Sequence, residues 1–302
     1  MLVPLNGPES LIVAATATCE SVSTRINYAA ALRLFMAWCN GSRPLDRQSV
    51  AEYLASMADR SISGSRARLA LSAIKKLTYE AEITGAIDHI AAMGIRELKG
   101  PKRSGQRAGR WLTIEQERQL LSAPNRNTPI GKRDRAMLAV LLGCGLRRTE
   151  VCDLETRHVD MRDSRPCLVD IMGKGGKTRT VPMPWPCYER ITTWKDAANI
   201  TDGVIFFATQ RTRKTGFGDA TVWQRVTRHA ARIGLQVAPH DLRRTAARRW
   251  YREKGNIREV QQLLGHSSPE TTIRYLGTDL PPLEHSAVDE AAEIWEEFVS
   301  AP

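Results

Sequence analysis

The sequence predicts a mainly α-helical chain with a small β-sheet, an α+β protein of two domains. Three observations lead to this prediction. The chain has 302 residues, and a basic, glycine-rich segment divides it. Apolar residues recur at helical spacing in both halves. One pair of short strand-like segments flanks a glycine-rich turn in the second half.

The first half predicts a helical domain over residues 1–98. In residues 23–39, apolar side chains recur every three or four positions and end at Cys39. Further helices are expected at 49–58, 65–82 and 86–98. We find no catalytic grouping here, and a bundle with a purely structural role is the alternative to a binding domain.

The second half follows a linker at residues 99–110. This linker has five basic residues, three glycines, one proline and no acid, a composition that predicts a flexible segment. In the second domain, 111–302, we expect the following elements. Helices are predicted at 113–123 and 132–142, a hairpin of strands at 168–172 and 178–182, and helices again from 222 onward.

The C-terminal segment has its own pattern. No lysine or arginine follows Arg274, whereas seven acids do, and apolar residues recur among them at helical spacing. This pattern predicts an amphipathic helix over residues 286–299.

Charge and composition narrow the function. Lys and Arg total 44 against 33 Asp and Glu, a net charge of +11, which points to a polyanion such as nucleic acid or to a basic surface that aids solubility. No apolar run approaches the ~20 residues of a membrane span, and the first residues lack the pattern of an export signal. The six cysteines form no CxxC pair, which favours reduced thiols in the cytoplasm and predicts no metal site.

Two segments of the second half place basic residues where an anion could bind. Arg147 and Glu150 lie three apart after a glycine-rich helix end, and a surface ion pair is the alternative. Lys174 and Lys177 lie on the glycine turn of the hairpin, where they could deliver a proton or form a solvated basic turn.

Three further segments carry histidine, arginine and tyrosine. His240 and Arg243, three apart on a predicted helix, could contact one phosphate together. His266 follows a predicted helix C-terminus, and Tyr275 lies nine residues beyond it. A structural histidine and a core tyrosine are the alternatives.

The order and spacing of these five motifs resemble the catalytic domain of tyrosine recombinases. They are GxRxxE, a lysine hairpin, HxxR, LGH and a tyrosine nine residues later. The first half, with its YxxxLxxFxxWC-like first helix, resembles the SAM-like helical core-binding domain of that family. Arg244 stands where family members often have histidine.

The resemblance implies a role for each motif residue. Arg147 and Arg243 would clamp the scissile phosphate, with His240 and His266 assisting by hydrogen bonding and proton handling. Tyr275 would be the nucleophile that forms a 3′-phosphotyrosyl link, with nearby cations favouring its phenolate. Lys174 would be the general acid, and Lys177 is the alternative candidate for that role. Glu150 would support the catalytic residues without itself acting on the substrate. Such chemistry requires neither a metal cofactor nor ATP.

The resemblance also implies partners. Two domains would close as a C-clamp on double-stranded DNA carrying specific recombination sites. The chain would act as a homotetramer, with or without a second recombinase, and exchange strands through a Holliday junction. The residues expected to contact DNA are Arg66, Arg68, Lys75, Lys76, Lys102, Arg103, Arg107, Arg110, Lys177 and Arg244.

The acidic C-terminal helix would pack on a neighbouring protomer, or in the simplest case on its own domain. The residues expected at that interface are Val288, Ala292, Trp295 and Phe298. About twenty residues precede the first core-binding helix, which favours an Xer-like or mobile-element layout without an arm-binding domain.

Three alternatives remain open at the level of sequence. One is a type IB topoisomerase, which shares the chemistry. Another is a DNA-binding architectural factor that no longer cleaves, and the last is a helical nucleic-acid adaptor whose motifs are accidental. The sequence does not separate integration, excision and resolution.

Overall fold

The computed structural model describes residues 8–101, 110–173, 176–208 and 216–276. Its contacts divide the chain into two compact units, residues 1–106 and 107–302. Among the described helices, none combines the length and the hydropathy of a membrane span. The predicted helix at 286–299 and eight predicted site residues lie outside the described residues: Lys102, Arg103, Arg107, Lys174, Val288, Ala292, Trp295 and Phe298.

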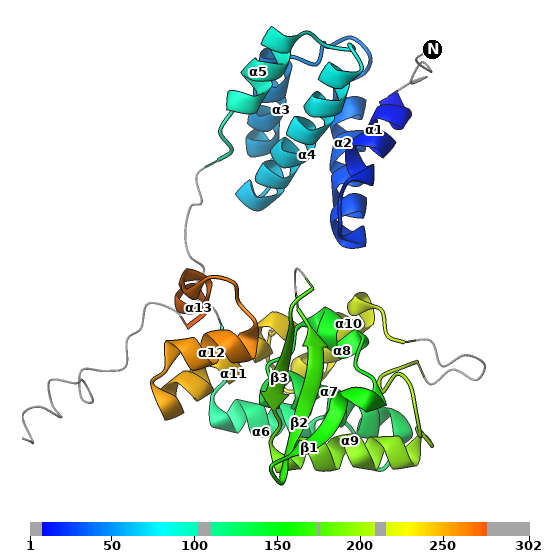
Figure 1. The fold of residues 1–302 in the computed structure, drawn as a ribbon, viewed down its shortest axis with the longest axis vertical. Coiled ribbons are helices and arrows are strands. Elements are labelled where there is room, and N and C mark those ends of the chain that lie inside the picture. The colour runs from blue at the N-terminus through cyan, green and yellow to red at the C-terminus, as the bar shows by residue number, and fades with distance from the viewer. Residues whose placement is uncertain (1–7, 102–109, 174–175, 209–215, 277–302) are drawn as a thin grey trace, which may run out of the picture. The chain divides into compact units, whose positions relative to one another are not determined.

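The first unit is a helical bundle built around α4 (Figure 1). Its described helices are α1 (Pro8–Ala17), α2 (Val22–Cys39), α3 (Arg47–Asp59), α4 (Gly64–Ile83) and α5 (His89–Glu97). Helix α4 packs against each of the other four, and its side chains Ala73, Ile74 and Leu77 are fully buried. Helices α2 to α5 each begin after a serine or aspartate that accepts a backbone N–H of the first turn.

The four helices predicted in this half agree with α2 to α5 to within three residues. Helix α1 was not predicted. Its residues from Leu11 to Ala15 are apolar without interruption, so the segment shows none of the alternation that marks a helix with one exposed face.

The second unit has α7 at its centre. Its described elements are α6 (Ile114–Ser122), α7 (Pro129–Gly143), α8 (Arg148–Cys152), the 3-10 turn η1 (Thr156–His158), β1 (Val159–Arg162), β2 (Arg165–Met172), β3 (Thr178–Pro182), α9 (Trp185–Ala197), α10 (Asp219–Ala231), α11 (Pro239–Lys254), α12 (Ile257–Leu264) and α13 (Pro269–Leu276). Every residue of 136–142 is buried, and α7 packs against α6, α9 and α11. Because α7 is apolar around most of its circumference, the other helices enclose it.

The sheet of the second unit is antiparallel, in the order β1-β2-β3. Leu168 of β2 pairs with Val181 of β3, and the register shifts between Leu168 and Ile171, where Asp170 has a φ of 53°. Strand β3 contacts α12, which brings the sheet beside the helices at the C-terminal end of this unit. Strand β1 and helix α9 were not predicted, because β1 is four residues long and mostly exposed and α9 lacks a clear apolar stripe. The mainly helical fold with one small sheet confirms the predicted fold class.

Candidate active site

Tyr275 lies near the end of α13, with its hydroxyl against His240 of α11. The Oη atom is 2.8 Å from Nε2 and 3.0 Å from Nδ1 of His240, and the two ring planes are 82° apart. Helix α11 begins at Pro239, which is well suited to a first helical position, so His240 stands in the first turn. The packing of α13 on α11 therefore joins two of the predicted motifs.

His266 is a second imidazole beside Tyr275. The ring centroids of His266 and Tyr275 are 5.1 Å apart. His266 follows Gly265, which ends α12 in the left-handed conformation at a φ of 61°, and its Nδ1 lies 3.0 Å from Oγ1 of Thr272. Thr272 is fully buried on α13. The orientation of His266 thus depends on both the turn after α12 and the helix that carries Tyr275.

Glu150 is buried among arginines, with its side chain 4% exposed. Its carboxylate accepts the backbone N–H of Arg147 at 2.7 Å and the Nη1 of Arg147 at 2.7 Å. It also accepts Nη1 and Nη2 of Arg179, from β3, at 2.9 and 2.8 Å. Burial tends to raise the pKa of Glu150, but the hydrogen bonds from Arg179 and Arg147 outweigh it and hold the pKa below its ordinary value. The Arg147–Glu150 pair is therefore a partly buried contact rather than an exposed surface ion pair.

Arg243 is almost completely enclosed, at 1% exposed. Its Nη1 donates to the carbonyl of Gly145 and its Nη2 to the carbonyl of Leu264. Its buried Nε has no hydrogen-bond partner among the described residues. Because buried donors are nearly always paired, an orphaned N–H on a charged side chain indicates a place for an anion or water.

Desolvation and the surrounding cations together lower the pKa of both histidines to about 4. For His240, which is exposed on one side, desolvation by the packed protein is the largest cause, followed by the charges of Arg244 and Arg243. For His266, burial comes first, followed by the charges of Arg243 and Arg147. Both imidazoles are therefore neutral at pH 7, and His240 can accept a proton. Burial lowers the pKa of Arg243 to about 10, so this guanidinium keeps its charge at neutral pH.

The pKa of Tyr275 is raised rather than lowered. Burial of the phenol is the largest cause and outweighs the opposing charges of Arg243 and Arg244. Nearby cations do favour the phenolate, as expected, but burial of the phenol has the larger effect. The hydroxyl keeps its proton at neutral pH, and a nucleophilic Tyr275 needs a base.

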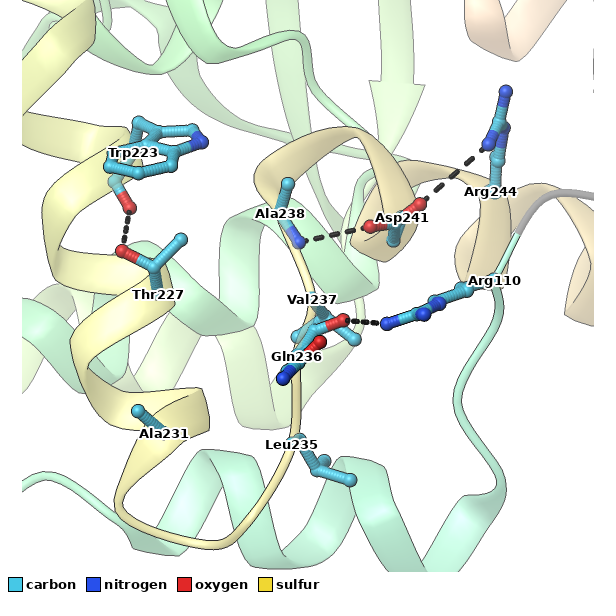
Figure 2. A pocket seen from close by; sticks show the side chains of 10 residues that line it. All are labelled: Arg110, Trp223, Thr227, Ala231, Leu235, Gln236, Val237, Ala238, Asp241 and Arg244. Atoms are coloured by element: carbon cyan, nitrogen blue, oxygen red, sulfur yellow. Dashed lines mark hydrogen bonds and ion pairs between the residues drawn. The ribbon is translucent and has the colours of Figure 1, made fainter. Parts of the chain in front are cut away.

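Arg244 links this site to a hollow of about 850 Å³, drawn in Figure 2. Its guanidinium carbon is 5.3 Å from the centre of the Tyr275 ring, and its Nη1 is 3.6 Å from Oδ1 of Asp241. Arg110 lines the same hollow, where its Nη1 donates to the carbonyl of Gln236 at 3.0 Å. Trp223 of α10 also lines it and is 47% exposed. Two residues predicted to contact DNA thus line one hollow, and one of them, Arg244, lies beside the candidate nucleophile.

Of the other described residues predicted to contact DNA, one lies in the second unit and four lie in the first. Lys177 is exposed in the hairpin turn, where its carbonyl accepts the N–H of Gly173 at 2.8 Å. Arg68 donates to the carbonyl of Pro101 and to Oγ of Ser65. The four candidates of the first unit all lie on α4: Arg66, Arg68, Lys75 and Lys76.

Sequence reasoning missed two residues of the site, Arg179 and Thr272. Arg179 is two positions from the buried Val181, so both point to the same side of β3. An arginine on the core side of a half-buried strand requires an acidic partner, and this signal could have revealed it. Thr272 lies three positions before Tyr275 and therefore on the same helix face, but nothing in the sequence indicates His266 as its partner.

A family model described as the phage integrase family matches residues 110–279, more than half of the chain. The chain belongs to the phage integrase family. This membership confirms the resemblance to tyrosine recombinases that the five motifs indicate.

Two curated relatives in this family are similar to the chain to different extents. Tyrosine recombinase XerA of Thermococcus kodakarensis is 36% identical over 180 residues, which cover 59% of this chain and 61% of the relative. Tyrosine recombinase XerD of Pseudomonas putida is 31% identical over 279 residues, which cover 84% of this chain and 86% of the relative. The chain spans about three fifths of the length of the first curated relatives that it matches.

A solved structure of XerH site-specific recombinase, bound to palindromic difH substrate in a post-cleavage complex, has the same fold. Its TM-score is 0.74 at 19% identity, and the match covers 96% of this chain and 85% of that chain.

Proposed function

We propose that this chain is a site-specific DNA recombinase that cleaves and rejoins DNA through a 3′-phosphotyrosyl intermediate. The observation that carries the proposal is the Tyr275 hydroxyl, 2.8 Å from a neutral His240 and bordered by arginine side chains, in a member of the phage integrase family. A tyrosine hydroxyl placed among cations and next to a base suits attack on a phosphodiester.

In the proposed cleavage step, the Tyr275 oxygen attacks phosphorus while its proton passes to Nε2 of His240. Arg147 and Arg243 stabilise the charge on the non-bridging oxygens, and His266 donates a further hydrogen bond. The bound phosphodiester also offsets the guanidinium charges that depress the pKa of His240. Binding of substrate therefore makes His240 a stronger base than in the free chain.

The bond that breaks joins phosphorus to the 5′ oxygen of the leaving strand. Lys174 is our candidate to protonate that oxygen, and Lys177 is the alternative on the same turn. Rejoining is the reverse reaction, in which a 5′-hydroxyl displaces Tyr275 and the protons return. Since the phosphotyrosyl ester retains the energy of the broken bond, rejoining needs no ATP.

The substrate that we propose is double-stranded DNA with specific recombination sites. In support, the solved structures that resemble the chain include XerH bound to palindromic difH substrate and a lambda integrase dimer bound to a COC' core site. We further propose a C-clamp on the DNA, a homotetramer and a Holliday-junction intermediate. The C-terminal segment with Trp295 would join neighbouring protomers. Six free, buried cysteines fit action in the cytoplasm.

The alternatives, a type IB topoisomerase and a silent architectural factor, are less well supported. The curated relatives are recombinases, and the catalytic motifs of the chain are complete in the sequence. Relaxation of supercoiled DNA of any sequence by a monomer would favour the topoisomerase.

The test is to trap covalent protein–DNA adducts in cells and sequence the attached ends. We expect adducts at defined sites with the wild-type chain and none with Tyr275→Phe, which removes only the hydroxyl. An oligonucleotide with the mapped site and a nick should then yield the same adduct in vitro. The proposal fails if a folded wild-type chain that binds this site forms no adduct, or if Tyr275→Phe still forms one.

A further inference from the structure

Three guanidinium groups surround the carboxylate of Glu150. Arg147 and Arg179 bond to it directly, and Nη1 of Arg243 lies 3.7 Å from its Oε2. At neutral pH this cluster has three positive charges against one negative charge. The positive charge that remains to attract a phosphate therefore depends on which arginine neutralises Glu150.

Arg179 is the arginine most fully committed to Glu150. It forms two parallel bonds to the two carboxylate oxygens, and its Nε donates to the carbonyl of Leu263 at 2.8 Å. Its side chain is 9% exposed, against 26% for Arg147. Since these bonds engage all three nitrogens of Arg179, it is poorly placed to bind a phosphate, whereas Arg147 remains open to one.

Arg179 also fixes the turn that precedes His266. A Cβ atom on Gly265 would lie 3.1 Å from Cδ of Arg179, so only glycine fits beside this arginine without displacement. Arg147 holds the same turn by donating to the carbonyl of Gly265 at 3.0 Å. Arg179 thus joins β3 to α8 through Glu150 and to the end of α12 through Leu263.

We infer that Arg179 is a positioning residue of the recombination reaction: it neutralises Glu150, so that the charges of Arg147 and Arg243 are left for the scissile phosphate. The inference rests on the proposed function. Without Arg179, Glu150 is compensated by Arg147 and Arg243, and their attraction for an anion falls. Removal of Arg179 therefore changes the electrostatics of the site as well as its packing. The inference is testable because a purely structural role would change the packing alone.

The first experiment measures binding of inorganic phosphate to the full chain by calorimetry. In Arg179→Met, Kd for phosphate should rise about tenfold, because Glu150 then offsets the charges of Arg147 and Arg243 that would otherwise attract the anion. In the double variant Arg179→Met with Glu150→Gln, removal of that negative charge should restore most of the affinity. If the role of Arg179 were purely structural, the double variant should bind phosphate more weakly than Arg179→Met, since the second substitution removes further hydrogen bonds.

Two further variants serve as controls. Arg162→Met removes a positive charge from the exposed strand β1, where the Arg162 side chain forms an ion pair with Asp160, and should change Kd less than about twofold. Arg179→Lys keeps the charge with fewer hydrogen bonds and should lie between wild type and Arg179→Met. It replaces Arg179→Met in the comparison if thermal unfolding shows that the methionine variant does not fold.

The second experiment measures single-turnover cleavage of a nicked oligonucleotide with the mapped site. Arg179→Met should slow adduct formation about a hundredfold with little change in DNA affinity, and the double variant should recover part of the rate. Unchanged phosphate binding in Arg179→Met, a double variant weaker than the single one, or no phosphate binding by wild type would each overturn the inference. Absence of any wild-type adduct would instead contradict the proposed function, and the phosphate measurement would still decide the part played by Arg179.

Discussion

Replacement of Thr272 by valine would measure how much the reaction depends on the orientation of His266. Valine has nearly the same shape as threonine, so the substitution removes one hydrogen bond, the 3.0 Å contact from Oγ1 to Nδ1 of His266, without opening a cavity. Thr272 is fully buried, so no water replaces its hydroxyl. Loss of such a bond, with a ring nitrogen left unpaired, costs about 1–2 kcal/mol.

The same free energy fixes the kinetic expectation. If the correct ring orientation is needed in the transition state, 1–2 kcal/mol corresponds to cleavage that is roughly five- to thirtyfold slower. Cleavage is measured in a single turnover with the nicked oligonucleotide, and stability is measured by urea unfolding. The matched control is Thr271→Val, an exposed position on the same helix. Equal cleavage rates in the two folded variants would refute the dependence on His266 orientation.

Two other predictions concern stability. Because the pKa values of His240 and His266 fall to about 4 on folding, the unfolded chain binds more protons than the folded chain between pH 4 and 6.5. The free energy of unfolding should therefore decrease as pH falls through that range, by on the order of 2 kcal/mol for His266. Urea unfolding at a series of pH values should show this decrease, and the dependence on pH should be weaker in His266→Gln. Gly145→Ala should destabilise the chain by about 1–3 kcal/mol more than Gly234→Ala, since both residues have a positive φ but only at Gly145 would a Cβ lie 2.8 Å from the Trp250 ring. Equal unfolding midpoints in the two alanine variants would contradict this reason.

The sequence predicted the elements that have a regular apolar pattern. Helices α2 to α5 each combine apolar residues at helical spacing with a capping serine or aspartate, and both signals are local. Helix α1 and strand β1 lack such signals, since one is apolar without interruption and the other is short and exposed. Their conformation depends on packing against segments that are distant in the sequence.

The site shows the same division between local and distant information. Motif spacing identified Tyr275 and His240, and the structure brings them into contact. Arg179 escaped notice because its partner Glu150 is 29 positions away, and no local pattern connects the two. The direction of the Tyr275 pKa could not be predicted either, because it depends on the balance between burial and charge, which only the folded chain determines.

The carbonyl groups that hold Arg147 and Arg243 have a consequence for ligand affinity. Freezing an arginine side chain costs about 2 kcal/mol of rotamer entropy. Here the carbonyl of Gly265 fixes Arg147, and the carbonyls of Gly145 and Leu264 fix Arg243, before any ligand arrives. This entropy is therefore lost during folding and not during binding. An incoming phosphodiester meets arginine side chains that are already ordered, so the free energy of binding is not reduced by ordering them.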